Sequence, residues 1–241
     1  MNKESYKKMI LLENSHWWFV SRRKIIRNVI AKYTSIKNKN VLEIGCGSGG
    51  NLTMLSEFGR LSAIELDDST REIANQKNIC TVEKGELPGL KLNSKYDIIC
   101  LFDVLEHIDN DKGALCNINN LLKENGLLIL TVPAFMFLWN QHDIANHHKR
   151  RYTKNQLSEI LTDFNFKIKY SSYFNFILFP LILLARLISR MSSRKAKNDV
   201  FKHSTLSNTC LKFLFNFESY CLPYIKFPWG VSIIFVAKKG N

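Results

Sequence analysis

The stretch that most constrains the fold runs from Val41 to Gly50, VLEIGCGSGG, where a short apolar run meets a carboxylate and then four glycines. Glycine lets the backbone turn tightly, and it lets a ligand approach the N–H groups at the start of a following helix. Apolar residues then recur at helical spacing, at Leu52, Leu55 and Phe58. The stretch therefore predicts a strand that ends in a ligand-binding turn and continues into a helix.

The glycines alone are compatible with two classes of cofactor. Gly45, Gly47 and Gly50 also satisfy the G-x-G-x-x-G pattern of dinucleotide-binding proteins. Glu43 distinguishes the two classes, because a carboxylate at the strand end repels a pyrophosphate and attracts a cation. S-adenosylmethionine (SAM) is a cofactor of the second class, since it carries an ammonium and a sulfonium and no phosphate. The position of Glu43 therefore favours SAM over a nicotinamide dinucleotide.

Further acidic residues stand at the ends of the expected strands. Glu65 ends the apolar run 61–64, about twenty residues after the first glycine, where an adenosine ribose would present its hydroxyls. Glu86 and Asp103 stand near later strand ends. In a doubly wound sheet the ligand lies beyond the carboxyl ends of the strands. This distribution of acidic residues again favours a cationic ligand.

The middle of the chain alternates between strand and helix patterns. Residues 96–102 and 127–132 are nearly unbroken apolar runs, as expected of parallel strands covered on both faces. Helical spacing between Ala114 and Leu122 predicts a helix that ends at the cap signal Asn125-Gly126. A short strand is expected at 79–82. Such alternation predicts an α/β fold with a doubly wound parallel sheet.

Taken together, these features resemble the class I SAM-dependent methyltransferase family. The resemblance rests on the glycine turn with Glu43, on the segment 103–107 (DVLEH) and on the segment 131–133 (TVP). It covers about residues 10–175 and a last strand at 231–238. It implies a mostly parallel, seven-stranded, Rossmann-like sheet with N-terminal helices and a helical insertion before the final antiparallel strand. Residues 1–241 are expected to form a single methyltransferase domain.

The resemblance also assigns residues to the cofactor. It implies that the first strand end and its glycines hold the methionyl part of SAM, and that the second strand end binds the ribose hydroxyls. The segment after the third strand would meet the adenine edge. The end of the fourth strand would line the pocket of the transferred methyl group. The residues at these places are Glu43, Gly45, Gly47, Gly49, Glu65, Glu86, Leu87, Asp103 and Val104. Glu86 departs from the family, which more often has aspartate there.

Methyl transfer is an in-line displacement, so the enzyme must align the acceptor atom and remove a proton from a hydroxyl or amine. Histidine is the natural base near neutral pH. The candidates are His107, His142, His147 and His148. The pair His147-His148 lies on the loop after the strand 127–132, where a substrate would approach. For His107, a structural histidine at the start of a helix is the alternative.

The segment Asp103, Glu106 and His107 also resembles methyltransferases in which an E-x-x-E-H segment and a downstream histidine, here His147, bind a divalent ion. Aspartate replaces the first glutamate of that pattern, so a divalent ion is the less favoured interpretation and no metal ligands are assigned. The adjacent basic run 149–152 (KRRY) is expected either to bind a substrate phosphate or carboxylate or to be a solvated charge run.

Residues 1–36 are expected to form an N-terminal helical cap, because apolar residues recur there at helical spacing. The aromatic cluster 16–19 and the basic residues 22–24 either cover the cofactor or substrate cleft or pack against the sheet. The polar first residues show no secretion signal. The six cysteines are scattered without a C-x-x-C pair, so a reduced, cytoplasmic compartment is expected.

Residues 175–229 form an expected insertion of unusual composition. Residues 174–188 are apolar apart from Asn175 and Arg186, but the run is shorter than the roughly twenty residues that span a bilayer, and Pro180 interrupts it. Basic residues and then aromatic residues follow, and the chain carries a net charge of +13. Such a composition is typical of a segment that lies in the surface of an anionic membrane. A hydrophobic lid or a dimer face is the alternative.

The sequence therefore predicts a SAM-dependent methyltransferase that acts on an oxygen or nitrogen atom of a small or lipid-linked acceptor. It is expected in the cytoplasm, peripheral at the inner membrane face. An RNA methyltransferase is one alternative, although no RNA-binding module is recognisable and the basic residues flank an apolar run. A membrane-associated binding protein without catalytic activity is another, against which Glu43 and the intact glycines speak.

Overall fold

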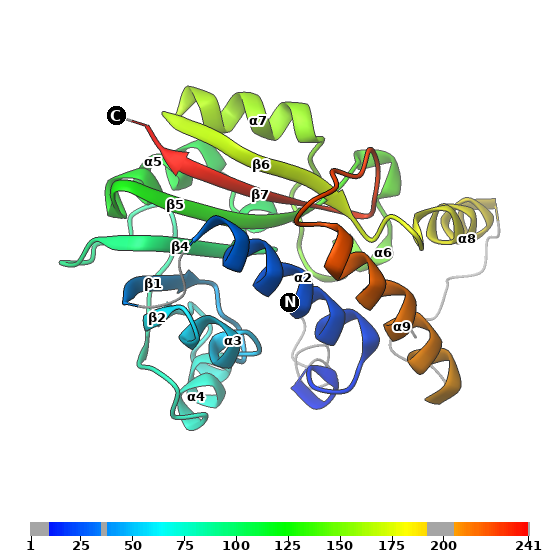
Figure 1. Cartoon of the computed structure of the whole chain (residues 1–241), viewed down its shortest axis with the longest axis horizontal. Helices are drawn as coiled ribbons and strands as arrows, with labels where there is room; N and C mark the ends of the chain where they lie inside the picture. The colour runs from blue at the N-terminus through cyan, green and yellow to red at the C-terminus, as the bar shows by residue number, and fades with distance from the viewer. Residues whose placement is uncertain (1–9, 35–37, 192–204, 241) are drawn as a thin grey trace.

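The computed structural model describes residues 10–34, 38–191 and 205–240. Their central feature is a seven-stranded sheet with the strand order β3-β2-β1-β4-β5-β7-β6 (Figure 1). The strands are β1 (Lys39–Ile44), β2 (Gly59–Ile64), β3 (Val82–Glu83), β4 (Tyr96–Phe102), β5 (Leu122–Pro133), β6 (Phe166–Phe174) and β7 (Ser232–Lys239). β7 pairs antiparallel with both of its neighbours, and the other pairs are parallel. The predicted fold class is thus confirmed.

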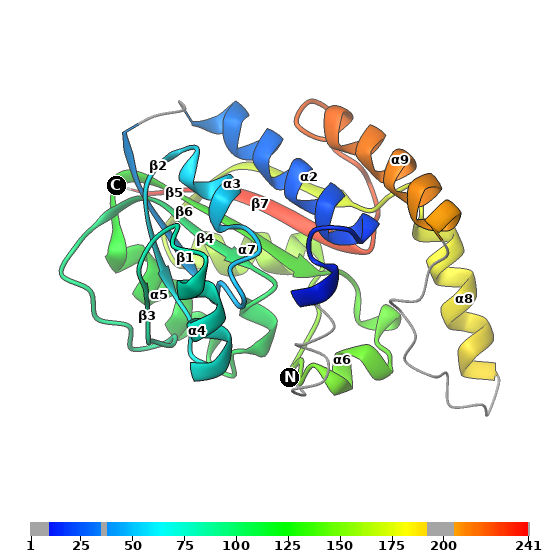
Figure 2. The same cartoon turned by 90° about the horizontal axis from the view of Figure 1, so that it is seen from below.

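Helices cover both faces of this sheet (Figures 1 and 2). They are α2 (Trp17–Tyr33), α3 (Leu52–Ser56), α4 (Asp68–Gln76), α5 (Asp111–Leu121), α6 (Gln141–Ala145), α7 (Lys154–Asp163), α8 (Phe179–Met191) and α9 (Thr205–Cys221). Two short 3-10 turns, η1 (Leu105–His107) and η2 (Met136–Leu138), follow β4 and β5. The strand ends and these connections hold most of the residues that the sequence assigns to the site.

Strand alternation divides the core into two layers. Val41 and Ile98 lie in the layer with α2, α3 and α9, and their neighbours Leu42 and Ile99 lie in the layer with α5 and α7. Successive side chains of a strand point to opposite faces, so an unbroken apolar run is what a sheet covered on both sides requires. This explains why the central strands lack polar residues over most of their length.

The N-terminal helix α2 lies alongside α9, which comes from the far end of the chain (Figure 2). The ring of Trp18 stacks on Phe215 of α9 at 5.4 Å and on Phe174 of β6 at 6.2 Å between centroids. The aromatic cluster of the N-terminal segment therefore packs into the protein instead of facing a cleft. Residues 1–9 and 35–36 of the expected N-terminal cap lie outside the described residues, as do residues 192–204 of the expected insertion.

Two predicted boundaries are wrong. α5 ends at Leu121, and β5 begins at the next residue, so Asn125-Gly126 does not cap a helix. Asn125 does have a φ of +65°, but it lies within β5, where a bulge shifts the pairing with β4. β3 begins only at Val82, so the expected strand 79–82 is misplaced. No helix in the described part of the chain has both the length and the apolar character to cross a membrane.

Candidate active site

The glycine turn joins β1 to α3 in a conformation that favours glycine. Gly45, Gly47 and Gly49 have φ values of +73°, +56° and +80°. A Cβ on Gly45 would lie 2.6 Å from Cγ2 of Val104, whereas a Cβ on Gly47 would meet no atom within 4 Å. Gly45 therefore permits close packing against the end of β4. Gly47 faces open space, as a residue of a ligand cradle would.

Glu43 lies beneath this turn and is only 1% exposed. Its Oε1 accepts a hydrogen bond from Nδ2 of Asn51 at 2.8 Å, but its buried Oε2 has no hydrogen-bond partner among the described residues. Burial raises the pKa of Glu43 to about 8, although the hydrogen bond from Asn51 acts in the opposite direction. A buried carboxylate oxygen without a donor is costly, so the site fits a cationic ligand that supplies one.

Glu65, at the end of β2, holds the turn from the opposite side. Its Oε2 accepts a hydrogen bond from the backbone N–H of Gly47 at 2.7 Å, and its Oε1 accepts one from the N–H of Asp67 at 3.0 Å. A carboxylate has about four acceptor sites, so these two bonds leave capacity for ribose hydroxyls. Glu65 is therefore part of the turn as well as a candidate for cofactor binding.

Glu86 and Leu87 follow β3 in a loop. Leu87 is buried beside Ile64 in the second core layer, and Glu86 is exposed. Glu86 lies three residues beyond the end of β3 at Glu83, so it is near a strand end. The apolar Leu87 is the better placed of the two to form one wall of an adenine site.

Asp103, at the end of β4, takes part in an ion pair with the N-terminal helix. Nη2 of Arg22 lies 2.6 Å from its Oδ2 and donates a hydrogen bond to the hydroxyl of Thr131 at 2.8 Å. The Thr131 hydroxyl in turn donates to Oδ1 of Asp103 at 3.0 Å. Helix α2 thus reaches the ends of β4 and β5 through Arg22, one of the basic residues 22–24 that the sequence placed either over the cleft or against the sheet.

A second contact from the N-terminal segment reaches the glycine turn. Oε2 of Glu13 accepts a hydrogen bond from the hydroxyl of Ser48 at 2.8 Å, and its Oε1 lies 2.5 Å from Nζ of Lys77. The polar residues of this segment therefore contact the cofactor turn, while its aromatic residues pack against α9 and β6. The contact made by Glu13 was not among the predictions for this segment.

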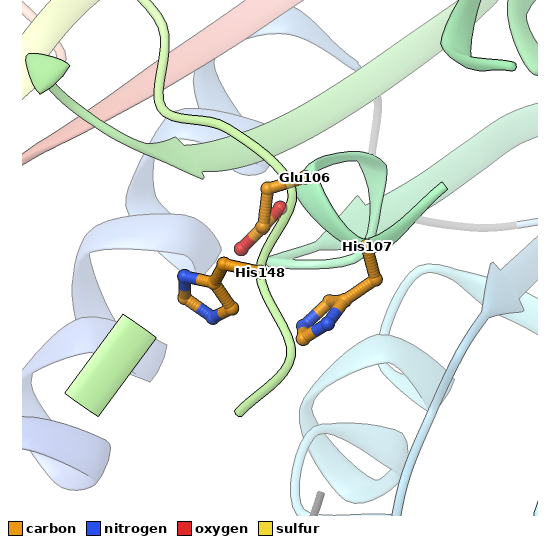
Figure 3. Close-up of side chains that lie close together, drawn as sticks. All are labelled: Glu106, His107 and His148. Carbon is orange, nitrogen blue, oxygen red and sulfur yellow. The ribbon is translucent and has the colours of Figure 1, made fainter. Parts of the chain in front are cut away.

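Glu106, His107 and His148 form a cluster (Figure 3). One ligand atom from each of the three lies within 4.8 Å of the others. Glu106 and His107 belong to η1, and His148 comes from the loop between α6 and α7. The rings of His107 and His148 are perpendicular, with centroids 4.7 Å apart. The structure thus brings together two of the histidines that the sequence singled out.

The cluster is buried enough to perturb proton binding. Glu106 is fully buried, and neither carboxylate oxygen has a hydrogen-bond partner among the described residues. Burial, reinforced by the charge of Asp103, holds the pKa of Glu106 well above its ordinary range. Burial and the charge of His148 lower the pKa of His107 to about 4. At neutral pH, His107 is therefore neutral.

Asp143 of α6 orients His148. Its Oδ1 lies 2.9 Å from Nδ1 of His148, and Arg151 donates to both carboxylate oxygens, at 2.8 and 3.0 Å. Burial acts to raise the pKa of Asp143, but the hydrogen bonds from His148 and Arg151 outweigh it and hold this pKa below its ordinary range. Asp143 was not among the predicted site residues. The only signal in the sequence was an acid in the same loop as the histidines.

The other histidines of the loop differ in position. His147 is exposed, has a φ of +58° and lies outside the cluster, so it does not complete the metal set suggested by the sequence. His142 is partly buried and its Nε2 lies 2.9 Å from Nδ2 of Asn146. Asp103, the first member of that suggested set, is ion-paired with Arg22. His148 takes the place that His147 was expected to fill.

The basic run beside these histidines is engaged within the protein. Lys149 pairs with Asp109 at 3.1 Å, Arg150 with Asp111 at 2.8 Å, and Arg151 with the buried Asp143. A substrate phosphate would have to compete with these carboxylates. The structure therefore favours a structural role for this run over anion binding.

Comparison with known proteins agrees with this arrangement. A family model described as a methyltransferase domain matches residues 19–171. The ubiquinone biosynthesis O-methyltransferase of Rickettsia typhi is 24% identical over 205 residues, which cover 70% of this chain and 81% of that protein. The enzyme of the same name from Glaesserella parasuis is 31% identical over 124 residues, covering 44% and 52%.

Two solved structures share the fold. A SAM-dependent methyltransferase from Clostridium acetobutylicum has a TM-score of 0.60 at 14% identity, covering 99% of this chain and 97% of that one. Phosphoethanolamine N-methyltransferase 2 of Haemonchus contortus, solved in complex with SAM, has a TM-score of 0.60 at 15% identity, covering 90% and 52%. At these identities the likeness extends to the fold alone.

Proposed function

The chain belongs to the methyltransferase domain family and is a SAM-dependent methyltransferase, and from that premise we propose that it methylates an oxygen or nitrogen atom of a small or lipid-linked acceptor. The proposal depends most on the hydrogen bond between Nδ1 of His148 and the buried Asp143. An ionised carboxylate keeps the imidazole proton on Nδ1 and leaves Nε2 free to accept another. His148 is thus the general base that takes the proton of the acceptor.

The glycine turn is the proposed place of the methionyl part of SAM. The unpartnered Oε2 of Glu43 suits its ammonium, and the backbone of the turn, open at Gly47, suits its carboxylate. When bound, SAM supplies an electrophilic methyl group on its sulfonium. Glu65 then accepts from the ribose hydroxyls with its remaining acceptor sites, and Leu87 provides an apolar contact for adenine.

Asp103 and Val104 are proposed to line the pocket in which the methyl group is transferred. The ion pair with Arg22 and the hydrogen bond from Thr131 fix the Asp103 carboxylate in one orientation. Val104 packs against Gly45, so the end of β4 and the glycine turn are in direct contact. Arg22 is a positioning residue in this scheme, because it acts through Asp103.

The acceptor is proposed to be a small or lipid-linked molecule, with the enzyme peripheral at the cytoplasmic face of an anionic membrane. The names of the Rickettsia typhi and Glaesserella parasuis relatives support an oxygen acceptor. The net charge of +13 supports attraction to an anionic surface. The exposed apolar residues of α8 support contact with lipid.

A divalent ion is the alternative to simple base catalysis. Glu106, His107 and His148 offer a carboxylate and two imidazoles, a donor set that suits zinc or a similar ion. A carboxylate that orients a ligating histidine, as Asp143 would here, is common around such ions. Turnover can be compared before and after exhaustive chelation. Full activity without metal would leave His148 as the base. A loss of activity that added metal restores would assign the cluster to an ion.

The acceptor class can be identified with methyl-labelled SAM. We expect label in the lipid or small-metabolite fraction of an extract, and none when His148 is replaced by glutamine. Label that enters only RNA would show that the acceptor assignment is wrong, while the SAM assignment would stand. Label in no fraction, combined with no calorimetric binding of SAM, would overturn the proposed function as a whole.

A further inference from the structure

The outer face of α8 exposes a row of aliphatic side chains. Leu181, Leu184, Leu187 and Ile188 are between 47% and 65% exposed. Three of them recur at the spacing i, i+3 and i+7, which places them on one side of the helix. On the opposite side, Ile182 packs against the core and Arg186 is partly buried. An apolar helix face in water is unfavourable, so this face requires a covering surface.

Further exposed apolar side chains lie on the segments next to the active site. Met136 and Phe137 of η2 and Ile144 of α6 are each about half exposed. The ring of Phe135, just before η2, stacks on Phe137 at 4.9 Å and contacts the first residue of α8, Phe179, at 6.2 Å. α6 carries Asp143, which orients His148. The turn η2 and the start of α8 are therefore linked through the ring of Phe135.

The sequence from α8 to α9 is rich in basic residues, although residues 192–204 lie outside the described part of the chain. Arg186 of α8 lies close enough to His142 of α6 for its charge to contribute to the lowered pKa of that histidine, after burial. Between residues 186 and 212 the sequence holds seven lysines and arginines and one acidic residue, Asp199. Aliphatic side chains beside a basic segment are complementary to an anionic lipid surface, which offers both hydrocarbon and negative charge.

We propose that the outer face of α8, with η2 and α6, is a membrane-docking surface that seats the enzyme on an anionic bilayer with the His148 loop at the lipid surface. The docking surface consists of the exposed apolar residues Met136, Phe137, Ile144, Leu181, Leu184, Leu187 and Ile188. α8 has 13 residues, so it lies in the plane of the membrane and does not cross it. The proposal rests on the proposed function in one respect: the acceptor that reaches His148 arrives from the bilayer.

A matched pair of leucine substitutions tests the docking surface. Leu184→Glu adds one negative charge to its centre, and Leu11→Glu adds the same charge to an exposed leucine of the N-terminal segment. Both variants and the unmodified full chain are sedimented with vesicles of phosphatidylcholine and phosphatidylglycerol. We expect Leu184→Glu to weaken binding at least tenfold, and Leu11→Glu to leave it within twofold, which are rough bounds. Added salt or vesicles without phosphatidylglycerol should also weaken binding.

Calorimetric binding of SAM serves as the folding control, because the docking surface does not include the cofactor residues. Unchanged vesicle binding by Leu184→Glu would overturn the proposal. Light scattering gives a second way to overturn it. If the unmodified chain is a dimer and Leu184→Glu is a monomer, a second copy of the chain covers this face. If the chain binds vesicles but methyl-labelled SAM transfers no label to any lipid, the lipid-linked acceptor is refuted and the docking surface stands.

Discussion

Nδ1 of His148 lies 2.9 Å from Oδ1 of Asp143, a carboxylate with no solvent exposure. Arg151 donates hydrogen bonds to both oxygens of the Asp143 carboxylate. Asp143 is therefore fixed in the position from which it orients the imidazole of His148. This relationship distinguishes His148 from the adjacent His147, which is exposed. The choice of base thus depends on one buried acid.

The two adjacent histidines provide a matched pair for the catalytic assignment. His148→Gln should lower kcat by about a hundredfold or more, as expected for loss of a general base. His147→Gln should leave kcat within about threefold, because that side chain lies outside the cluster. Both should bind SAM with unchanged affinity in calorimetry. Equal losses of kcat in the two variants would remove the assignment of His148.

Asp143 should also contribute strongly to stability. Asp143→Ala leaves the buried guanidinium of Arg151 without its partner, and breaking a buried pair costs about 3 to 5 kcal/mol. Asp109→Ala is the control, because it breaks the exposed ion pair with Lys149 and should cost less than about 1 kcal/mol. Urea unfolding monitored by circular dichroism measures both. Similar losses would show that Arg151 finds another partner.

The sequence predicted the local features of the cofactor turn. Glu43 and its glycines follow one another within a few residues, so their geometry is determined by local backbone rules. The contacts made by Arg22 were not predictable in the same way, because Arg22 and Thr131 are 109 residues apart in the sequence. Which surface of α2 faces the sheet depends on packing against α9, for which the sequence offered no signal.

The histidine loop and β5 show two further limits of sequence patterns. His147 and His148 are adjacent and chemically identical, but His148 is hydrogen-bonded to Asp143 while His147, with a φ of +58°, is exposed. Asn125-Gly126 is a signal both for a helix end and for a turn, and here it belongs to an irregular part of β5. In both cases contacts with residues outside the short pattern accompany the observed conformation, and the pattern alone does not contain them.

Binding of SAM should release a proton from Glu43. The pKa of Glu43 is raised to about 8 by burial, so at pH 7 the carboxyl is mostly protonated, and a cationic ligand favours the ionised form. Calorimetry at pH 7 in buffers of different ionisation enthalpy should detect about one proton released. Below pH 7.5 the α-amino group of SAM remains largely protonated, since such groups titrate at about 7.7 to 8.0. Affinity should therefore rise as the pH increases from 6 to 7.5.

Glu43→Gln provides the control for this proton. It should abolish the proton release and weaken SAM binding by about tenfold, or about 1.4 kcal/mol. Proton release that persists in Glu43→Gln would assign it to another group. Unchanged affinity would remove Glu43 from the cofactor site.

Glu106 should make the stability of the free protein depend on pH. Its pKa is raised above the ordinary value of 4.5, so the folded state holds a proton that the unfolded state releases. The contribution of Glu106 is therefore fully present below pH 4.5 and is lost as the pH rises toward the folded-state value. Glu106→Gln cannot ionise, so its Tm should fall less between pH 5 and pH 8 than that of the unmodified protein. Parallel Tm curves would show that Glu106 stays ionised when folded.

Two alanine substitutions in the glycine turn separate ligand binding from packing. Both positions have positive φ, so an alanine at either costs about 1 to 2 kcal/mol of backbone strain. Gly45→Ala should cost more, because its Cβ would lie 2.6 Å from Val104, and a lower Tm should report this. Gly47→Ala meets no atom of the protein within 4 Å, so its Cβ should block mainly the bound cofactor and weaken SAM binding at least tenfold, a rough bound. If Gly47→Ala binds SAM normally in calorimetry, the open space beside Gly47 does not hold the cofactor, and the methionyl part must lie elsewhere along the strand ends.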